Sequence, residues 1–305
     1  MHTLVILQQM AVIAILVLIG FYLQKKEILE EQTEKKLSAI VMDIVNPALI
    51  MSCVLTGDLT ATHQDLIHAI GIGVLLYAVF CLLGILIPKI LPIKKEDRKF
   101  YHLMTVYTNV GFIGIPVAKA VLPENAMLCV IVCNVLYCLL FYTHGIMVLA
   151  EGREKIRLKK ILSPGTVMAI LTLLLFWFDI SLPEIVANSV IYIGNATVFL
   201  SMSLLGASIA KTSIREGIKD KSIWLYLLIR MVAVPVVLVL ILRTLNVASE
   251  MVQAFFLMAA MPVGNLPLIQ AEKIGEKTEI LSRGIVVTTV LCFFTITGLM
   301  AVLKL

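Results

Sequence analysis

The sequence has few charged residues. Only 15% of its 305 residues are Asp, Glu, Lys or Arg, whereas 60% are hydrophobic and the mean hydropathy is +1.00. Soluble domains are about half apolar and about a quarter charged. The composition therefore excludes an ordinary water-soluble domain and predicts a chain that crosses a membrane many times.

Catalytic and nucleotide-binding motifs are also missing. The sequence contains no H-E-x-x-H, no G-x-S-x-G, no G-x-x-x-x-G-K-[ST] and no closely spaced carboxylate pair inside its hydrophobic windows. The six cysteines include no C-x-x-C pair. An enzyme, a built-in ATP engine and a metal site are therefore not expected.

Ten hydrophobic windows have the length of about 20 residues that a membrane-spanning helix needs. They cover residues 3–23, 37–56, 66–87, 100–122, 126–149, 163–181, 187–210, 222–242, 251–272 and 284–303. The first window does not read as a signal peptide, because no Lys or Arg precedes it and no small-residue cleavage site follows it. The predicted fold is an all-α polytopic membrane protein with ten transmembrane helices.

The basic residues gather in alternate loops. With the N-terminus outside, 21 of the 25 Lys and Arg residues fall in the cytosolic loops. Since cytosolic loops are enriched in Lys and Arg, both termini are predicted to lie outside the cytoplasmic membrane. Anionic lipid of the inner leaflet is then a sufficient partner for the net charge of +5, and no nucleic acid is expected.

The two halves of the chain show a weak internal repeat. "GIPVAKA" from Gly114 aligns with "NLPLIQA" from Asn265, and "NPALIMSCVLTG" from Asn46 aligns with "NATVFLSMSLLG" from Asn195. Both alignments pair windows of the first half, residues 1–150, with those of the second half, residues 151–305. Because each half has five windows, the second repeat would have inverted topology, as in many secondary transporters.

Helix-breaking residues interrupt the fourth and ninth windows. "NVGFIGIP" runs from Asn109 to Pro116, and "MPVGNLP" runs from Met261 to Pro267. Irregular backbone at membrane depth is tolerated where it is buried in protein or lines a polar cavity. We therefore expect helices 4 and 9 to be broken and to cross near the membrane middle, where helix N-termini favour an anion and carbonyl ends favour a cation.

This crossover defines the candidate substrate site. Gly111 and Gly114 are expected to supply backbone freedom at the break, and Pro116 and Pro267 to open the second half-helices. The candidate substrate-binding residues are Asn46, Pro47, Asn109, Gly111, Gly114, Pro116, Pro262, Gly264, Asn265 and Pro267.

The stretch from Asn109 to Pro116 and "MPVGNLPLIQAEKIG" from Met261 resemble the crossover spans of the auxin efflux carrier family, and the resemblance covers the whole chain. It implies a sodium/proton antiporter-like crossover fold with interleaved scaffold and transport subdomains, an elevator-like movement, a crossing at Asn109 and Pro262, and a small organic anion as substrate. Thr108 stands where plant members commonly have a proline, and their long hydrophilic loop is absent. The first departure argues against plant-like auxin recognition, and the second favours a bacterial-type permease.

Asp43 and Arg230 lie several residues inside their predicted spans, which makes them functional hypotheses. Asp43 could carry a coupling proton or hold sodium, and Arg230 could bind the anion or pair with Asp43; alternatively, both extend to the interface or are structural. Apart from such a proton or sodium ion, no cofactor is expected. The sequence leaves open a coupled symporter or antiporter of another small solute, a channel, and a homodimer.

Overall fold

The computed structural model describes residues 2–55, 60–151, 163–211 and 221–305. Within these ranges the regular structure is helical, apart from one isolated antiparallel bridge between Thr108 and Val263. Every hydrophobic window contains helix. The all-helical class predicted from the sequence is confirmed.

The helices follow one another in this order. The first half contains α1 (His2–Lys25), α2 (Glu31–Ile40), η1 (Val41–Val45), α3 (Asn46–Ser52), α4 (His63–Ile90), η2 (Lys95–Asp97), α5 (Arg98–Val106), η3 (Val110–Gly114), α6 (Ile115–Val121), η4 (Glu124–Ala126), α7 (Met127–Leu140), η5 (Phe141–Gly145) and α8 (Ile146–Leu149). The second half contains α9 (Pro164–Trp177), α10 (Glu184–Lys211), α12 (Lys221–Leu227), η7 (Leu228–Ala233), α13 (Val234–Thr244), α14 (Ser249–Ala260), α15 (Leu266–Ile274) and α16 (Glu279–Leu303).

Several helices suit a bilayer in length and in surface. Among the described residues, five are long and apolar enough to cross a membrane: His63–Ile90, Glu124–Leu149, Glu184–Lys211, Ser222–Thr244 and Glu279–Leu303. Large apolar side chains also cover the outer faces of several helices. On α4, for example, Ile67, Val74, Leu75, Leu82 and Ile90 are exposed. Such surfaces are unfavourable in water and are expected in lipid. The structure is that of a multi-pass membrane protein.

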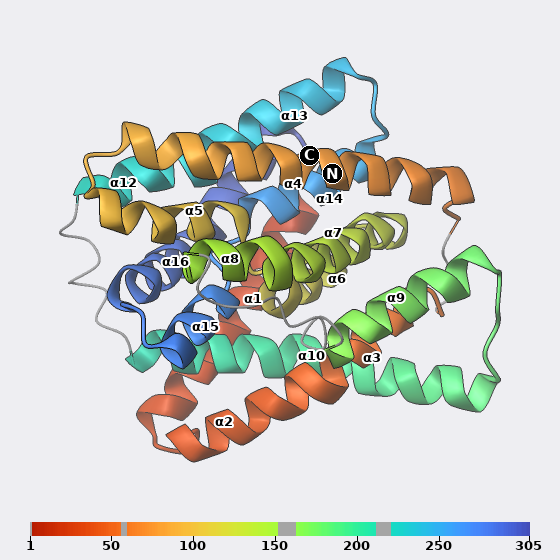
Figure 1. Cartoon of the computed structure of the whole chain (residues 1–305). Coiled ribbons are helices and arrows are strands. Elements are labelled where there is room, and N and C mark those ends of the chain that lie inside the picture. The colour runs from red at the N-terminus through yellow and green to blue at the C-terminus, as the bar shows by residue number, and fades with distance from the viewer. Residues whose placement is uncertain (1, 56–59, 152–162, 212–220) are drawn as a thin grey trace.

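The interrupted helices lie in the interior. Figure 1 shows α2, α9 and α10 along one edge of the molecule and α4 and α13 along the opposite edge. Residues 100–110 and 254–264, which contain the two helix breaks, are buried throughout. The irregular backbone is thus enclosed by protein, as its position in a membrane requires.

Wide π-helical turns allow three helices to continue past a proline. Pro47, Pro116 and Pro235 each stand two residues after the end of a π-turn, namely η1, η3 and η7. A proline has no N–H to donate, and its ring clashes with the carbonyl four residues earlier in an α-helix. A π-turn widens the helix there and relieves both conflicts.

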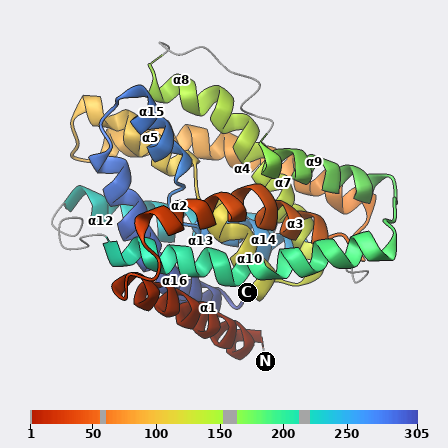
Figure 2. The same ribbon diagram turned by 90° about the horizontal axis from the view of Figure 1, so that it is seen from below.

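Glycines bring α1 and α10 into backbone contact, and Figure 2 shows the two helices side by side. A Cβ on Gly206 would lie 1.9 Å from the carbonyl oxygen of Val17, and a Cβ on Gly20 would lie 2.0 Å from that of Ser203. Small residues are enriched where membrane helices pack, because close backbones gain van der Waals contact. Gly20 and Gly206 therefore set the distance between α1 and α10.

We expect Gly206→Ala to destabilise the protein by about 1–3 kcal/mol, since the added methyl group overpacks this contact. Thermal unfolding of the purified protein in detergent measures the effect. Gly71→Ala is the matched control, because it lies on α4 with no atom within 4 Å of its added Cβ. Equal unfolding midpoints for the two variants would contradict this account of the α1 and α10 contact.

Candidate functional site

The two interrupted helices cross through a short antiparallel pairing. The N–H of Asn109 donates to the carbonyl of Pro262 at 2.7 Å, and the N–H of Gly264 donates to the carbonyl of Tyr107 at 2.8 Å. Thr108 and Val263 are the bridged pair between them. The crossing therefore lies at Asn109 and Pro262, and the backbone groups freed by each break bond to the other segment.

Side-chain hydroxyls complete the crossing. The hydroxyl of Thr108 donates to the carbonyl of Met258 at 3.3 Å, and the hydroxyl of Thr288 accepts from the N–H of Val263 at 3.0 Å. The carbonyl of Met258 needs such a donor because the residue four positions later is Pro262, which has no N–H. A proline at position 108 could not make this bond.

Gly264 leaves no room for a side chain. A Cβ there would lie 2.8 Å from the hydroxyl of Tyr137, 3.0 Å from the carbonyl oxygen of Tyr107 and 3.1 Å from that of Thr108. Two of these atoms belong to the backbone of the partner segment and cannot move independently. Glycine at position 264 is therefore required for the close crossing.

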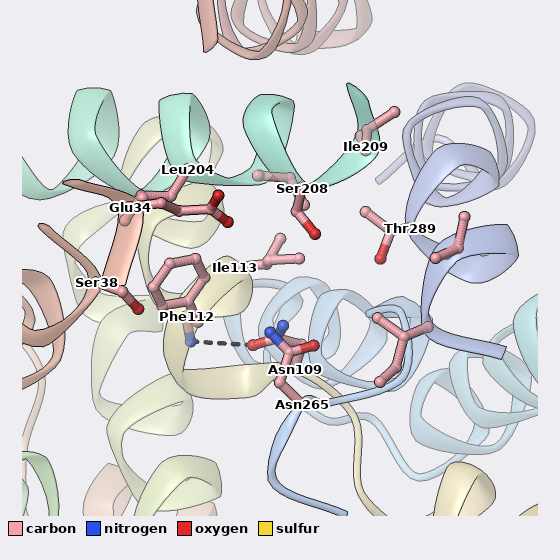
Figure 3. Close-up of a pocket in the computed structure, with 13 residues that line it drawn as sticks. Glu34, Ser38, Asn109, Phe112, Ile113, Leu204, Ser208, Ile209, Asn265 and Thr289 are labelled. Carbon is pink, nitrogen blue, oxygen red and sulfur yellow. Dashed lines mark hydrogen bonds between the residues drawn. The ribbon is translucent and has the colours of Figure 1, made fainter. Parts of the chain in front are cut away.

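After the crossing, each of the two segments continues into a helix, and an asparagine stands directly before that helix. Asn109 caps η3, and its Oδ1 accepts from the N–H of Phe112 at 3.2 Å. Asn265 precedes α15, and its carbonyl accepts from the N–H of Ile269 at 3.0 Å. Figure 3 shows the two side chains next to each other. Two helix N-termini, each with partial positive charge, thus meet beside a pair of amides.

Two cavities adjoin these asparagines. The first has a volume of about 110 Å³ and is lined by Glu34, Ser38, Asn109, Phe112, Ile113, Leu204, Leu205, Ser208, Ile209, Asn265, Ile285, Val286 and Thr289. The second has a volume of about 200 Å³ and is lined by Ser38, Met42, Asp43, Asn46, Asn109, Gly111, Phe112, Asn134, Tyr137, Cys138, Tyr142, Ser163, Pro164, Gly165, Thr166, Asn265, Leu266 and Ile269. Their common wall is formed by Ser38, Asn109, Phe112 and Asn265.

Further amides lie in the second cavity. The Nδ2 of Asn46 donates to the carbonyl of Gly111 at 3.1 Å, and its buried Oδ1 has no hydrogen-bond partner among the described residues. The Oδ1 of Asn134 lies 3.1 Å from where a Cβ of Gly111 would be. Gly111 thus leaves room for the amide of Asn134.

The position of the first helix break differs from the sequence prediction. We expected it across Asn109 to Gly114, but α5 ends at Val106 and the non-helical residues are 107–109. Val110–Gly114 forms η3, and neither Gly111 nor Gly114 has a positive φ. The two glycines therefore provide space rather than backbone freedom; a Cβ on Gly114 would lie 3.3 Å from the carbonyl oxygen of Asn109.

The prolines take two different positions. Pro267 is the second residue of α15, where its missing N–H has no helical partner to lose, as predicted. Pro116 does not open a half-helix, because its helix already begins at Val110 and η3 makes room for it. Pro47 follows η1 in the same way. Pro47, Gly114 and Pro116 line neither cavity, so they shape the helices beside the site.

The structure separates the two ionisable candidates. Asp43 lies in η1, is exposed and lines the second cavity. Arg230 lies in η7, is 2% exposed and lines neither cavity. No ion pair joins Asp43 to Arg230 among the described residues. The guanidinium instead bonds to backbone carbonyls of the broken helices.

Sequence reasoning missed several residues of the cavity walls. Asn134 was detectable as a lone amide in the apolar run "CVIVCNVLYC". Thr289 in the last window was expected to bond to a carbonyl of its own helix and not to line a cavity. Glu34, which forms an ion pair with Lys211, gave no signal because it precedes the second window in a charged stretch. Its approach to the crossover depends on how α2 packs beside α10.

An ion-paired lysine joins the start of α5 to the segment after α15. The Nζ of Lys99 lies 2.8 Å from Oε2 of Glu276 and 3.2 Å from Oε1 of Glu151. Burial lowers the pKa of Lys99, but the hydrogen bonds and charges of the two glutamates outweigh it, so the pKa lies above its ordinary value. Because a raised lysine pKa favours the folded state until the pH rises through it, these pairs hold at neutral pH.

Comparisons with known proteins agree with this architecture. A family model described as a membrane transport protein matches residues 5–300. An uncharacterized transporter of Methanocaldococcus jannaschii is 28% identical over 218 residues, which are 68% of this chain and 70% of that protein. These matches indicate a membrane transporter rather than an enzyme. The chain belongs to the membrane transport protein family, which is the auxin efflux carrier family.

We expect Gly264→Ala to destabilise the protein by about 1–3 kcal/mol, because the methyl group would push the two crossing segments apart. The thermal unfolding midpoint in detergent measures this. Gly165→Ala is a matched control, since Gly165 lines the second cavity with no atom within 4 Å of an added Cβ. A Gly264→Ala variant as stable as Gly165→Ala would show that the crossing tolerates a wider spacing.

Proposed function

We propose that the chain is a secondary transporter that moves a small organic anion, a carboxylate, across the cytoplasmic membrane, with the substrate held at the crossover. The observation that carries the proposal is the pair Asn109 and Asn265. Each precedes the N-terminus of an interrupted helix, the two side chains are neighbours, and both line both cavities.

This arrangement suits a carboxylate for physical reasons. The N–H groups at a helix N-terminus and the positive end of its dipole attract negative charge, and two such ends meet here. The amide groups of Asn109 and Asn265 add hydrogen-bond donors without adding charge. The remaining walls combine apolar side chains with hydroxyl groups; the two carboxylates that also line the cavities are Glu34, which is ion-paired with Lys211, and Asp43. The small cavities favour a small ligand.

The position of the cavities supports alternating access. Glu34 and Ser38 come from α2, Ser208 from the end of α10, and Ser163 from the start of α9. The Lys and Arg distribution predicts all of these segment ends on the cytosolic side. We infer an inward-open state, in which the substrate reaches the crossover from the cytosol and an elevator-like movement would carry the site to the other side.

The inverted repeat of five spans is part of the same proposal. In residues 1–150, α5 ends before the crossing and η3 begins after it; in residues 151–305, α14 ends before it and α15 begins after it. The two breaks pair antiparallel, as inverted halves would. Paired interruptions of this kind are typical of transporter binding sites. Ten spans would place both termini outside.

We expect a panel of small carboxylates, including malonate and malate, to contain at least one that raises the unfolding midpoint of the purified protein. Asn265→Ala should weaken its binding about tenfold or more, since a hydrogen bond to a charged group contributes ~1.5–3 kcal/mol. Asn109→Ala should act similarly. Asn125→Ala is the control, because Asn125 bonds to Thr60 and lines neither cavity.

If neither Asn109→Ala nor Asn265→Ala changes the binding of the carboxylate, the proposed site is wrong. Transport itself is tested with the protein in liposomes. Saturable flux with counterflow of labelled anion is expected of a carrier, whereas unitary currents would show a channel.

Asp43 favours proton coupling as part of this transport. Its carboxylate lines the second cavity, where its negative charge would repel an anionic substrate unless the carboxylate is protonated. We expect Asp43→Asn to remove the dependence of anion uptake on a pH gradient while binding is retained. Asp179→Asn is the control, since Asp179 follows α9 and lines neither cavity. Uptake by Asp43→Asn that still follows the pH gradient would refute the coupling role.

A further inference from the structure

The crossing deprives two helix ends of their usual hydrogen bonds. In a continuous α-helix the carbonyl of Thr105 would accept from the N–H of Asn109, and the carbonyl of Ala259 from the N–H of Val263. The N–H of Asn109 instead donates to Pro262, and that of Val263 to the hydroxyl of Thr288. One carbonyl near the end of α5 and one near the end of α14 are thus left for another donor.

Arg230 donates to both carbonyls. Its Nε bonds to the carbonyl of Thr105 at 2.9 Å, and its Nη1 bonds to the carbonyl of Ala259 at 2.6 Å. The guanidinium carbon lies 4.4 Å from the centroid of the Phe80 ring, whose face attracts a cation. A single side chain from η7 therefore binds the carbonyl ends of both interrupted helices.

The charge of Arg230 matches its surroundings. The C-terminal end of a helix carries about half a negative elementary charge, so the ends of α5 and α14 together present about one. None of the ion pairs among the described residues includes Arg230, which leaves the two helix ends as its counter-charge. Its Nε and Nη1 bond to the two carbonyls and its buried Nη2 has no partner among those residues, so the described hydrogen bonds of the guanidinium go to backbone carbonyls and not to a carboxylate.

In other transporters with broken helices, the carbonyl ends coordinate sodium or a proton-bearing group. We propose that Arg230 is the fixed cation of this crossover: its guanidinium takes the place of a sodium ion between the carbonyl ends of α5 and α14 and so positions Asn109 and Asn265. The crossing then needs no bound metal cation. What this role of Arg230 means for transport rests on the proposed function. If Arg230 fills the cation site at the crossing, ion coupling must depend on other groups, such as Asp43.

The test compares the charge of Arg230 with its bulk. Arg230→Lys keeps a cation and Arg230→Met keeps a similar length without one. We expect the Lys variant to unfold at a temperature between those of the wild type and the Met variant, and the Met midpoint to fall by about 5 °C or more. If folded protein is recovered for Arg230→Lys but not for Arg230→Met, the result also supports the proposal. Equal behaviour of Lys and Met would overturn the proposal.

A second measurement tests whether the cation site is already filled. Unfolding of the wild type and of Arg230→Ala is followed in sodium, potassium, guanidinium and choline chloride at equal low concentrations. We expect no cation preference in the wild type and stabilisation of Arg230→Ala by guanidinium over choline. Arg243→Ala is the control, because Arg243 also bonds to carbonyls at a helix end, those of Leu303 and Lys304, but is exposed.

The proposal would be overturned if sodium alone stabilised the wild type in a saturable way and if Arg243→Ala retained this effect while Asn109→Ala lost it. Such a result would place sodium at the crossing. Lack of guanidinium rescue in a folded Arg230→Ala variant would do so as well. These measurements contain no carboxylate, so they succeed or fail independently of the substrate class. A failed carboxylate panel beside a clear difference between Lys and Met would refute the proposed substrate and leave the role of Arg230 intact.

Discussion

The backbone pairing of Thr108 with Val263 is the constraint on which the rest of the site depends. A bilayer offers no water to satisfy the carbonyls and N–H groups of a broken helix. Here each break supplies the partners of the other, through Asn109 with Pro262 and Gly264 with Tyr107. Neither interruption would be stable alone. The two breaks therefore occur together, and their mutual satisfaction is what brings two helix N-termini to one place.

The electrostatics follow from the same pairing. Because two helices end and two begin at the crossing, it has a side with partial negative charge and a side with partial positive charge. Arg230 lies against the negative side and lines no cavity, whereas Asn109 and Asn265 lie at the positive side and line both. The proposed internal cation and the proposed anion site are thus complementary consequences of one backbone arrangement.

Much of the fold and of the crossover could be predicted from the sequence, because burial in a membrane leaves few alternatives for the backbone. Asn109 and Asn265 were recognised as polar residues in interrupted apolar windows, and the resemblance to the auxin efflux carrier family implied the crossing at Asn109 and Pro262, where the backbone pairing lies. The exact end of α5 could not be predicted from the sequence, since glycine is equally compatible with a helix break and with the π-turn that Pro116 requires. The partners of Arg230 also could not be predicted, because backbone carbonyls carry no sequence signal.

The contacts of Arg230 also limit how the proposed elevator could divide the molecule. In such a movement an anchor that bonds to both interrupted helices would move with them, so η7 and the attached α13 would belong to the moving body. Helix α13 packs on α14, and α4 packs on α5. On the other side, Gly20 and Gly206 join α1 to α10, and α3 packs against α9 and α10. The first group includes α4 and α13 and the second includes α9 and α10, which lie along opposite edges of the molecule in Figure 1. Since the first cavity is lined by both the crossover and α10, sliding between the groups would change access to the asparagines without breaking the crossing.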